Sequence, residues 1–397
     1  MIFLDPWFWK FAVLAVTGYW LCPAVLKRIW LLAASLVFQY EFAGPAGMLP
    51  IILLSALTYG TGLLLSVRRD SRALALAFAA VIGALIFYKY AAFLVATVVG
   101  PVAGWIAPER VQALLEWRSP AAPLAISFFT FEFVHYLYEV GVRRVAPVRS
   151  VVDFALFATF FPTLASGPIK RFPDFVPQLA QLRNPNAGQI WSAARRVVLG
   201  LFKKICIADL LVEPIRVLEK SPEWSASVVV GLAVLQGARI YYDFSGYTDI
   251  AVGFAQMLGL RVPENFDRPY RATSLQDFWR RWHMSLTSWI RDYVYIPMGG
   301  NRRRAAVNLI AALVICGLWH GAAWNFALWG LYHGAGLAFE AGVRARLPRL
   351  FAPKGPRAFV RWSVCYGFVS YGWLLFFYPI DTVIEMTREA LRCGFGG

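Results

Sequence analysis

Two histidines lie inside strongly apolar stretches of a chain that has only four. His320 belongs to the run Gly317-Leu-Trp-His-Gly321, and His283 ends the run Trp279-Arg-Arg-Trp-His283. Lipid cannot solvate an ionisable side chain, so an imidazole kept at membrane depth indicates a functional site. Neutral imidazole is also the usual general base near neutral pH. The first chemistry to consider is therefore proton transfer.

The residues around His320 predict a dry reaction site. Glycines at 317 and 321 would let backbone or a ligand approach the ring closely. Trp319 and Trp324 would wall a pocket whose dryness keeps the imidazole uncharged. The ring could then take the proton from an attacking hydroxyl. The alternative is a core histidine bonded to a helix carbonyl.

The other three histidines are less distinctive. His283 precedes Met284 and Ser285, and it could be a second catalytic group, a hydrogen-bond partner or a structural residue. His333 follows His320 by thirteen residues in an apolar helix, and we expect it to be structural. His135 is expected to be a core residue with its hydrogen bonds satisfied.

Arginines and aromatic residues alternate between residues 267 and 304. Only three acids, Asp267, Asp277 and Asp292, oppose eight arginines, which are Arg268, Arg271, Arg280, Arg281, Arg291, Arg302, Arg303 and Arg304. Guanidinium groups suit phosphates and carboxylates, and aromatic faces can stack on them. This block fits an anionic donor, such as a coenzyme A thioester or an acidic carrier protein, or a uronate-containing acceptor. It could also be a cytoplasmic loop with an aromatic belt.

Two carboxylates, Asp243 and Asp249, interrupt an apolar segment. They could orient a histidine or bind a donor. They could equally cap a broken helix, because Asp and the intervening Ser and Gly favour caps and turns. The second, architectural role is the one we expect.

Composition predicts an integral membrane protein. Hydrophobic residues make up 59% of the 397 positions and charged residues 16%, and the mean hydropathy is +0.54. Soluble domains carry about 25% charged residues. No long polar linker divides the chain, so we expect one unit over residues 1–397. It would comprise N-terminal spans (1–120), a catalytic core (121–342) and a C-terminal span (343–397).

The net charge of +16 and the five cysteines do not require a further function. Basic residues cluster between apolar runs, as in cytoplasmic loops, and no nucleic-acid motif occurs. The cysteines are scattered without a C-x-x-C pair, so neither disulfides nor a metal site is predicted. The first apolar run, to about Leu26, is expected to be a retained span rather than a signal peptide.

Hydropathy predicts an all-α fold with roughly nine to eleven membrane spans. The candidates are Trp7–Leu26, Ile29–Phe42, Met48–Val67, Ala73–Tyr88, Ala91–Ile106, Pro120–Val140, Val151–Ile169, Val228–Phe244, Ala305–Trp319, Ala322–Ala341 and Phe359–Tyr378. Three stretches do not fit a plain span. Trp191–Val217 alternates basic and apolar residues, as an interfacial helix would, whereas Asp243–Leu260 and Arg268–Asn301 place polar groups at membrane depth. Such groups are tolerated where they line a wet cavity, so we expect these stretches to build a central one.

Several motifs together resemble the membrane-bound O-acyltransferases. They are Tyr242-Asp-Phe-Ser-Gly-Tyr-Thr-Asp-Ile-Ala251, Pro263-Glu-Asn-Phe-Asp-Arg-Pro-Tyr270, Asp277-Phe-Trp-Arg-Arg-Trp-His-Met-Ser-Leu286, Arg291-Asp-Tyr-Val-Tyr-Ile-Pro-Met-Gly-Gly-Asn301 and Gly317-Leu-Trp-His-Gly-Ala-Ala-Trp-Asn325. The branch they look most like is the alginate O-acetyltransferase subfamily. The resemblance implies helices around a membrane-crossing tunnel, with His320 as the catalytic histidine and His283 as the second one. It also implies a cytoplasmic thioester donor, a polysaccharide acceptor and a periplasmic or cell-surface partner of the SGNH-esterase type.

The sequence thus predicts a bacterial inner-membrane, multi-pass O-acyltransferase without a tightly bound cofactor or metal. Hydrolase and nucleotide-binding motifs are absent. Residues expected at the donor are Arg280, Arg281, Asp243, Trp279, Trp319 and Asn325. One alternative is a polysaccharide export component, although the absence of an internal repeat weakens it. Another is carrier-dependent D-alanyl transfer to teichoic acid.

Overall fold

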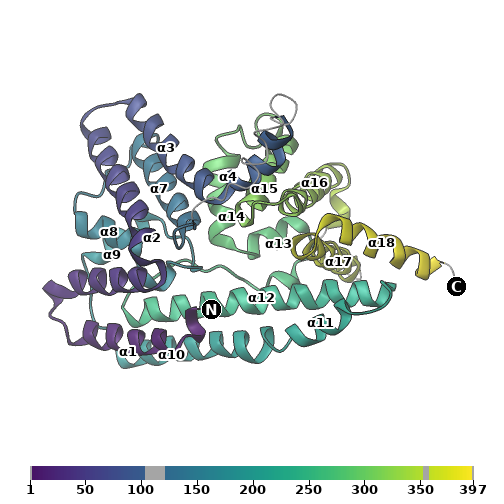
Figure 1. The fold of residues 1–397 in the computed structure, drawn as a ribbon, viewed down its shortest axis with the longest axis horizontal. Coiled ribbons are helices and arrows are strands. Elements are labelled where there is room, and N and C mark those ends of the chain that lie inside the picture. The colour runs from purple at the N-terminus through teal and green to yellow at the C-terminus, as the bar shows by residue number, and fades with distance from the viewer. Residues whose placement is uncertain (1, 103–120, 352–356, 396–397) are drawn as a thin grey trace. The chain divides into compact units, whose positions relative to one another are not determined.

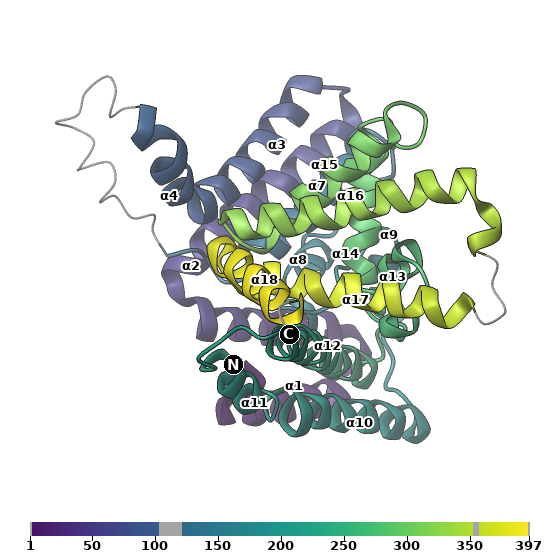
Figure 2. The same cartoon turned by 90° about the vertical axis from the view of Figure 1, so that its right-hand side faces the viewer.

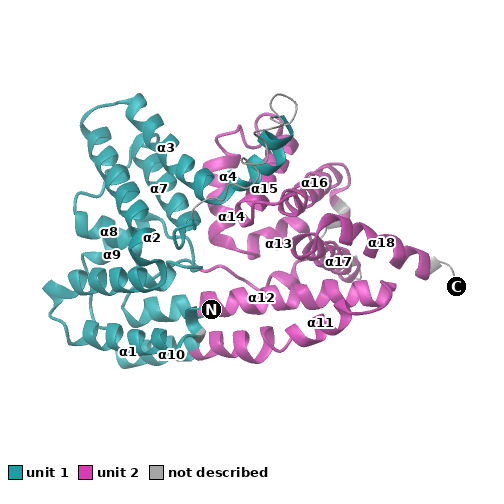
Figure 3. Cartoon of the chain, viewed as in Figure 1, with its two compact units in different colours: residues 1–197, 250–263 teal, residues 198–249, 264–397 magenta. Residues whose placement is uncertain are grey.

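The computed structural model describes residues 2–102, 121–351 and 357–395, and every regular element in those ranges is helical (Figure 1). The predicted all-α fold is therefore confirmed. The chain forms two compact units, coloured separately in Figure 3. Unit 1 comprises residues 1–197 and 250–263, and unit 2 comprises residues 198–249 and 264–397. Two of the three boundaries between the units fall inside helices, α10 (Ala187–Leu201) and α12 (Ala226–Met257), and the third follows Pro263 outside any helix.

Unit 1 consists mainly of apolar helices from the N-terminal half. They are α1 (Pro6–Leu21), α2 (Lys27–Val67), α3 (Ser71–Leu85), α4 (Ala91–Leu94), α7 (Ile126–Gly141), α8 (Val151–Thr159) and α9 (Phe172–Leu179). Short π-helical turns, Ile86–Tyr90 and Val95–Val99, flank α4. The predicted segments Ala91–Ile106 and Pro120–Val140 lie partly outside the described residues.

Helix α2 unites two of the predicted spans across a kink. Gly44 has φ 62° and ψ 176°, which are not helical values, and Pro45 follows it. Proline disfavours helical geometry in the residue before it, and glycine adopts positive φ without a steric penalty. The Gly44-Pro45 pair therefore separates two straight segments, which agree with the predicted Ile29–Phe42 and Met48–Val67.

Two ionisable side chains buried inside unit 1, Lys170 and His135, have hydrogen-bond partners. The Lys170 ammonium contacts the Glu132 carboxylate at 2.6 Å and the Thr163 hydroxyl at 2.9 Å. His135 Nε2 accepts a hydrogen bond of 3.0 Å from the backbone N–H of Phe172, and the side chain is buried. This confirms the expectation that His135 is a satisfied core residue. Buried charges need such partners because burial removes their hydration.

Unit 2 carries the motif-rich half of the chain. Besides most of α12 it contains α11 (Val212–Glu219), α13 (Leu275–Arg281), α14 (Met284–Ile290), α15 (Ala305–His320), α16 (Trp324–Arg346), α17 (Arg357–Phe377) and α18 (Ile380–Phe395). Figure 2 shows α15 and α16 side by side. A π-helical turn, Arg291–Tyr295, extends α14.

Helix α12 is continuous, so the prediction that Asp243 and Asp249 cap a broken helix is wrong. The helix runs through both residues to Met257. Lys204 contacts Asp243 at 2.7 Å, and Lys203 contacts Asp249 at 2.6 Å. Both lysines lie in the π-helical turn Phe202–Ala208. The ammonium groups neutralise the carboxylates, which lets a helix contain them without a break.

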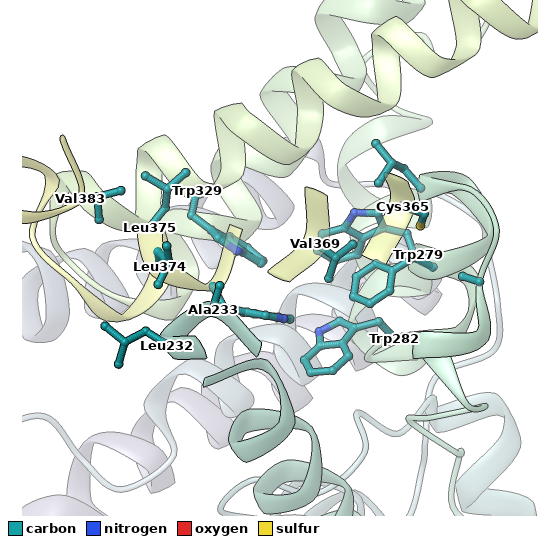
Figure 4. Packing of buried hydrophobic residues seen from close by; sticks show 14 of the residues in the cluster. Leu232, Ala233, Trp279, Trp282, Trp329, Cys365, Val369, Leu374, Leu375 and Val383 are labelled. Carbon is teal, nitrogen blue, oxygen red and sulfur yellow. The ribbon is translucent and has the colours of Figure 1, made fainter. Parts of the chain in front are cut away.

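A cluster of aromatic and aliphatic side chains forms the core of unit 2 (Figure 4). It draws on most of the unit's helices, and the members labelled in Figure 4 are Leu232, Ala233, Trp279, Trp282, Trp329, Cys365, Val369, Leu374, Leu375 and Val383. His333 lies against this cluster, with ring centroids 5.0 Å from Trp329 and 5.3 Å from Trp279. Burial of these large rings fixes the relative positions of α12, α13, α16 and α17.

In the part of the chain that the structure describes, two helices are long and apolar enough to cross a membrane, judged by length and composition. They cover Ala24–Val67 and Ser71–Val102. Val151–Thr163 and Ala305–His320 are shorter apolar helices. The expectation of nine to eleven spans stays a prediction.

Candidate active site

A cavity of about 770 Å³ lies within unit 2. Four elements line it. The lining residues are Gln276, Trp279 and Arg280 of α13; Met284, Thr287, Ser288 and Ile290 of α14, with Arg291, Tyr295 and Asn301 after it; Leu309, Ala312, Leu313 and Cys316 of α15; and Leu337, Glu340, Ala341, Arg344 and Ala345 of α16. The volume is typical of a small-ligand site.

The lining combines apolar walls with three arginines. The guanidinium groups of Arg280, Arg291 and Arg344 supply positive charge. Glu340 ion-pairs with Arg344 at 3.2 Å, and its carboxylate also accepts hydrogen bonds from the first backbone N–H groups of α13, those of Leu275 and Gln276. Such a cavity suits a ligand that combines an anionic group with an apolar remainder.

His283 lies one residue before Met284 of the cavity lining. It links α13 to α14 and is 2% exposed. Burial, together with the nearby His320, holds the pKa of the His283 imidazole well below its usual value, so the ring is neutral. Its Nδ1 has no hydrogen-bond partner among the described residues. A neutral, buried ring with a spare nitrogen can bond a substrate atom.

His320 is the last residue of α15. Leu309, Ala312, Leu313 and Cys316 of that helix line the cavity, and a helix repeats its facing positions every three or four residues. His320 is therefore the next residue on this face, about 6 Å beyond Cys316 along the axis. Its ring packs among Trp329, Phe376 and Trp319, with centroids 5.5, 5.1 and 4.8 Å away.

The structure brings the two predicted catalytic histidines to the same tryptophan, Trp319, although neither is itself a lining residue of the cavity. The Trp319 ring lies 4.8 Å from that of His320 and 6.3 Å from that of His283. Trp279, also predicted at the donor, lines the cavity beside Arg280.

Three other predicted donor residues have structural partners. Arg281 ion-pairs with Asp277 at 2.9 Å and Asp267 at 3.0 Å; Asp243 pairs with Lys204; and Asn325 donates a hydrogen bond of 3.2 Å to the carbonyl of Phe376. None of the three belongs to the cavity lining. Their roles at the donor stay predictions.

Trp324 does not wall a dry pocket. Its side chain is 57% exposed, because the backbone turns at Gly321 and α16 begins at Trp324. The ring that completes the wall beside His320 is instead Trp329. Spacing alone could not distinguish the two tryptophans, since both lie within a few residues of the turn.

The sequence analysis missed the contribution of α16. Leu337, Glu340, Ala341 and Arg344 all face the cavity. Their i, i+3, i+4, i+7 spacing is the signal of a single helix face. Arg344 was harder to recognise as part of this face, because basic residues near the end of an apolar run are typical of loops.

Comparisons with known proteins assign the chain to a family. The model of the membrane-bound O-acyltransferase family matches residues 127–387. The chain is 36% identical to a probable alginate O-acetylase AlgI of Azotobacter vinelandii, over 90% of this chain and 71% of that protein. It is 38% identical to a probable alginate O-acetylase AlgI of Pseudomonas fluorescens, over 64% of this chain and 51% of that one.

A third relative, the peptidoglycan O-acetyltransferase of Helicobacter pylori, is 30% identical over 95% of this chain and 77% of its own length. The chain belongs to the membrane-bound O-acyltransferase family, and it is an acyl-transferring enzyme. The match to the Pseudomonas protein spans only about half of that protein's length. The family model and these relatives confirm the resemblance inferred from the motifs.

Proposed function

We propose that this enzyme is a multi-pass O-acetyltransferase of the bacterial inner membrane. It would move an acetyl group from a cytoplasmic thioester to a hydroxyl of a secreted polysaccharide, directly or through a periplasmic SGNH-type relay protein. The observation that carries the proposal is that His283 adjoins Met284 of a cavity lined by three arginines, while the rings of His283 and His320 both lie beside Trp319. The names of the relatives favour alginate or a similar polymer as the acceptor.

The reaction needs a base, a polarising group and a held donor. His320 would take the proton of the acceptor hydroxyl as its oxygen attacks the thioester carbonyl. The C–S bond then breaks, an ester forms, and the imidazolium returns the proton to the thiolate. The neutral ring of His283 would orient the carbonyl or the hydroxyl by a hydrogen bond. No metal or tightly bound cofactor is needed for this balance.

The anionic end of the donor would bind the arginines of the cavity. We expect Arg280→Ala to raise the KM for the thioester about tenfold, with kcat little changed, because it removes one charge-assisted contact made equally in the ground and transition states. Initial rates at varied donor concentration measure this. Arg216→Ala is the control, since Arg216 pairs with Glu213 outside the cavity. An unchanged KM in Arg280→Ala would place the donor elsewhere.

The function itself is tested on polymer from a deletion strain carrying either the wild-type gene or a His320→Ala variant. Mass analysis of the purified polymer should show acetyl groups only with the wild type. A polysaccharide export component predicts a different outcome, namely less exported polymer with unchanged acyl content. Incorporation of D-alanine instead of acetate would indicate the D-alanyl transferase alternative.

A further inference from the structure

His283 has an unusual backbone conformation for a buried residue. Its φ of 42° and ψ of 53° lie in the left-handed region. Five non-glycine residues of the described chain have positive φ, and His283 is the buried one among them. Such a conformation costs free energy and persists only where the surrounding structure enforces it. The residues that enforce it therefore also determine where the imidazole points.

The segment around Asn265 holds the chain on both sides of His283. Before the histidine, the Arg281 carbonyl accepts a hydrogen bond of 3.0 Å from the Asp267 N–H. After it, the Met284 N–H donates to the Asn265 carbonyl at 2.9 Å. Both contacts are between backbone groups, so they would survive a change of the Asn265 side chain.

The Asn265 side chain adds contacts that backbone pairing cannot supply. It is fully buried. Its Oδ1 accepts hydrogen bonds from the Ser285 hydroxyl at 2.6 Å and from the Ser285 N–H at 3.3 Å. Its amide donates to the Thr248 hydroxyl on α12 at 3.4 Å. Asn265 thus connects the start of α14 to the long helix α12.

These contacts replace a missing helix cap. His283 occupies the N-cap position of α14 but makes no side-chain cap hydrogen bond. The first N–H groups of a helix need acceptors from elsewhere. Asn265 Oδ1 supplies one for Ser285, so the imidazole is not used as a cap. The ring instead packs edge-on against Phe244, with centroids 4.6 Å apart, and lies near Trp319.

We propose that Asn265 is a positioning residue: by capping α14 from outside the helix, it fixes the imidazole of His283 for acyl transfer. This inference rests on the proposed function, in which His283 contacts the reacting groups. Asn265 itself is not a lining residue of the cavity, and it acts through His283. Removal of the Asn265 side chain should therefore change the orientation of the His283 ring and leave donor binding unchanged.

The kinetic test uses the full-length enzyme in lipid nanodiscs. Asn265→Ala should lower kcat about 10- to 100-fold with an unchanged KM for the thioester, since a small misplacement of a catalytic group can cost that much. Asn265→Asp keeps the acceptor oxygen for Ser285 and should recover part of the loss. Ser285→Ala is a milder variant that removes one bond. Thr248→Val, which removes only the long contact to α12, is the matched control and should stay near wild type.

A double-mutant cycle separates positioning from a general structural role. In a His283→Ala background, Asn265→Ala should cause no further loss of kcat, because the group it positions is gone. If Asn265→Ala lowered kcat by the same factor in the His283→Ala background as in the wild type, the proposal would be overturned. An unchanged kcat in both Asn265→Ala and Ser285→Ala would overturn it too.

A second readout does not depend on activity. The protein has four histidines, so ¹⁵N-histidine labelling gives few ring signals, and His283→Ala identifies those of His283. We expect the His283 signals to broaden or split in Asn265→Ala and to remain sharp in Thr248→Val. Unchanged His283 signals in Asn265→Ala contradict the proposal even if the wild type transfers no acetyl group, whereas altered signals without any acetyl transfer would count against the proposed function alone.

Discussion

Replacement of His320 by alanine is expected to lower acyl transfer by about a hundredfold to ten-thousandfold, the usual contribution of a general base. The ring is the next position on the face of α15 that lines the cavity, so its loss removes the proton acceptor without removing the donor site. The donor KM should therefore change little. Single-turnover rates with a labelled acetyl thioester and a soluble glycan acceptor would measure the effect.

Stability provides the control for this variant. His320 lies at the end of its helix and is only partly buried, so the alanine variant should unfold at nearly the wild-type temperature. His135→Gln offers a contrast, because His135 is buried and bonded to the backbone of Phe172 in unit 1. We expect His135→Gln to lower the unfolding temperature and to leave kcat nearly unchanged. Wild-type transfer rates in His320→Ala would contradict the assignment of the base.

The sequence was sufficient to predict the all-α fold and the family, and it singled out two histidines whose catalytic roles stay predictions. Apolar runs predicted most helices of unit 1, and the predicted Ile29–Phe42 and Met48–Val67 correspond to the two parts of α2 on either side of Gly44-Pro45. His283 and His320 stand out because an imidazole in apolar sequence is costly unless it is used. These features depend on local composition, which a single sequence reports directly.

Partners distant in the sequence could not be predicted. Asp243 and Asp249 look like helix breakers on their own, yet Lys203 and Lys204, about forty residues earlier, neutralise them inside a continuous helix. Arg281 resembled Arg280 in every local respect, but its neighbours Asp277 and Asp267 engage its guanidinium group. Such pairings depend on how helices pack, and no periodicity encodes them.

The junction between α15 and α16 is expected to be the part of unit 2 most sensitive to a single added methyl group. A Cβ at Gly330 would lie 2.3 Å from the carbonyl oxygen of Leu313 and 2.8 Å from the Cα of Val314. These are backbone atoms of α15, so a side-chain rotation cannot relieve the overlap. The same holds in the opposite direction: Gly317 lies on α15, and a Cβ there would lie 2.1 Å from the Phe326 carbonyl oxygen of α16. The two helices can pack at their present distance only because both positions lack a side chain.

Gly330→Ala should therefore destabilise the protein by about 1–3 kcal/mol or more, as overpacking of a tight interface does. The variant should also reduce acyl transfer, because the overlap would displace α15, the helix that ends at His320. Gly342→Ala is the matched control on the same helix: a Cβ there meets no atom within 4 Å, and alanine favours helix over glycine by about 1 kcal/mol. Thermal unfolding of both variants in the same detergent measures the difference. If Gly330→Ala unfolds at or above the temperature of Gly342→Ala, then close backbone packing does not hold α15, and the position of His320 must depend on the aromatic rings around it instead.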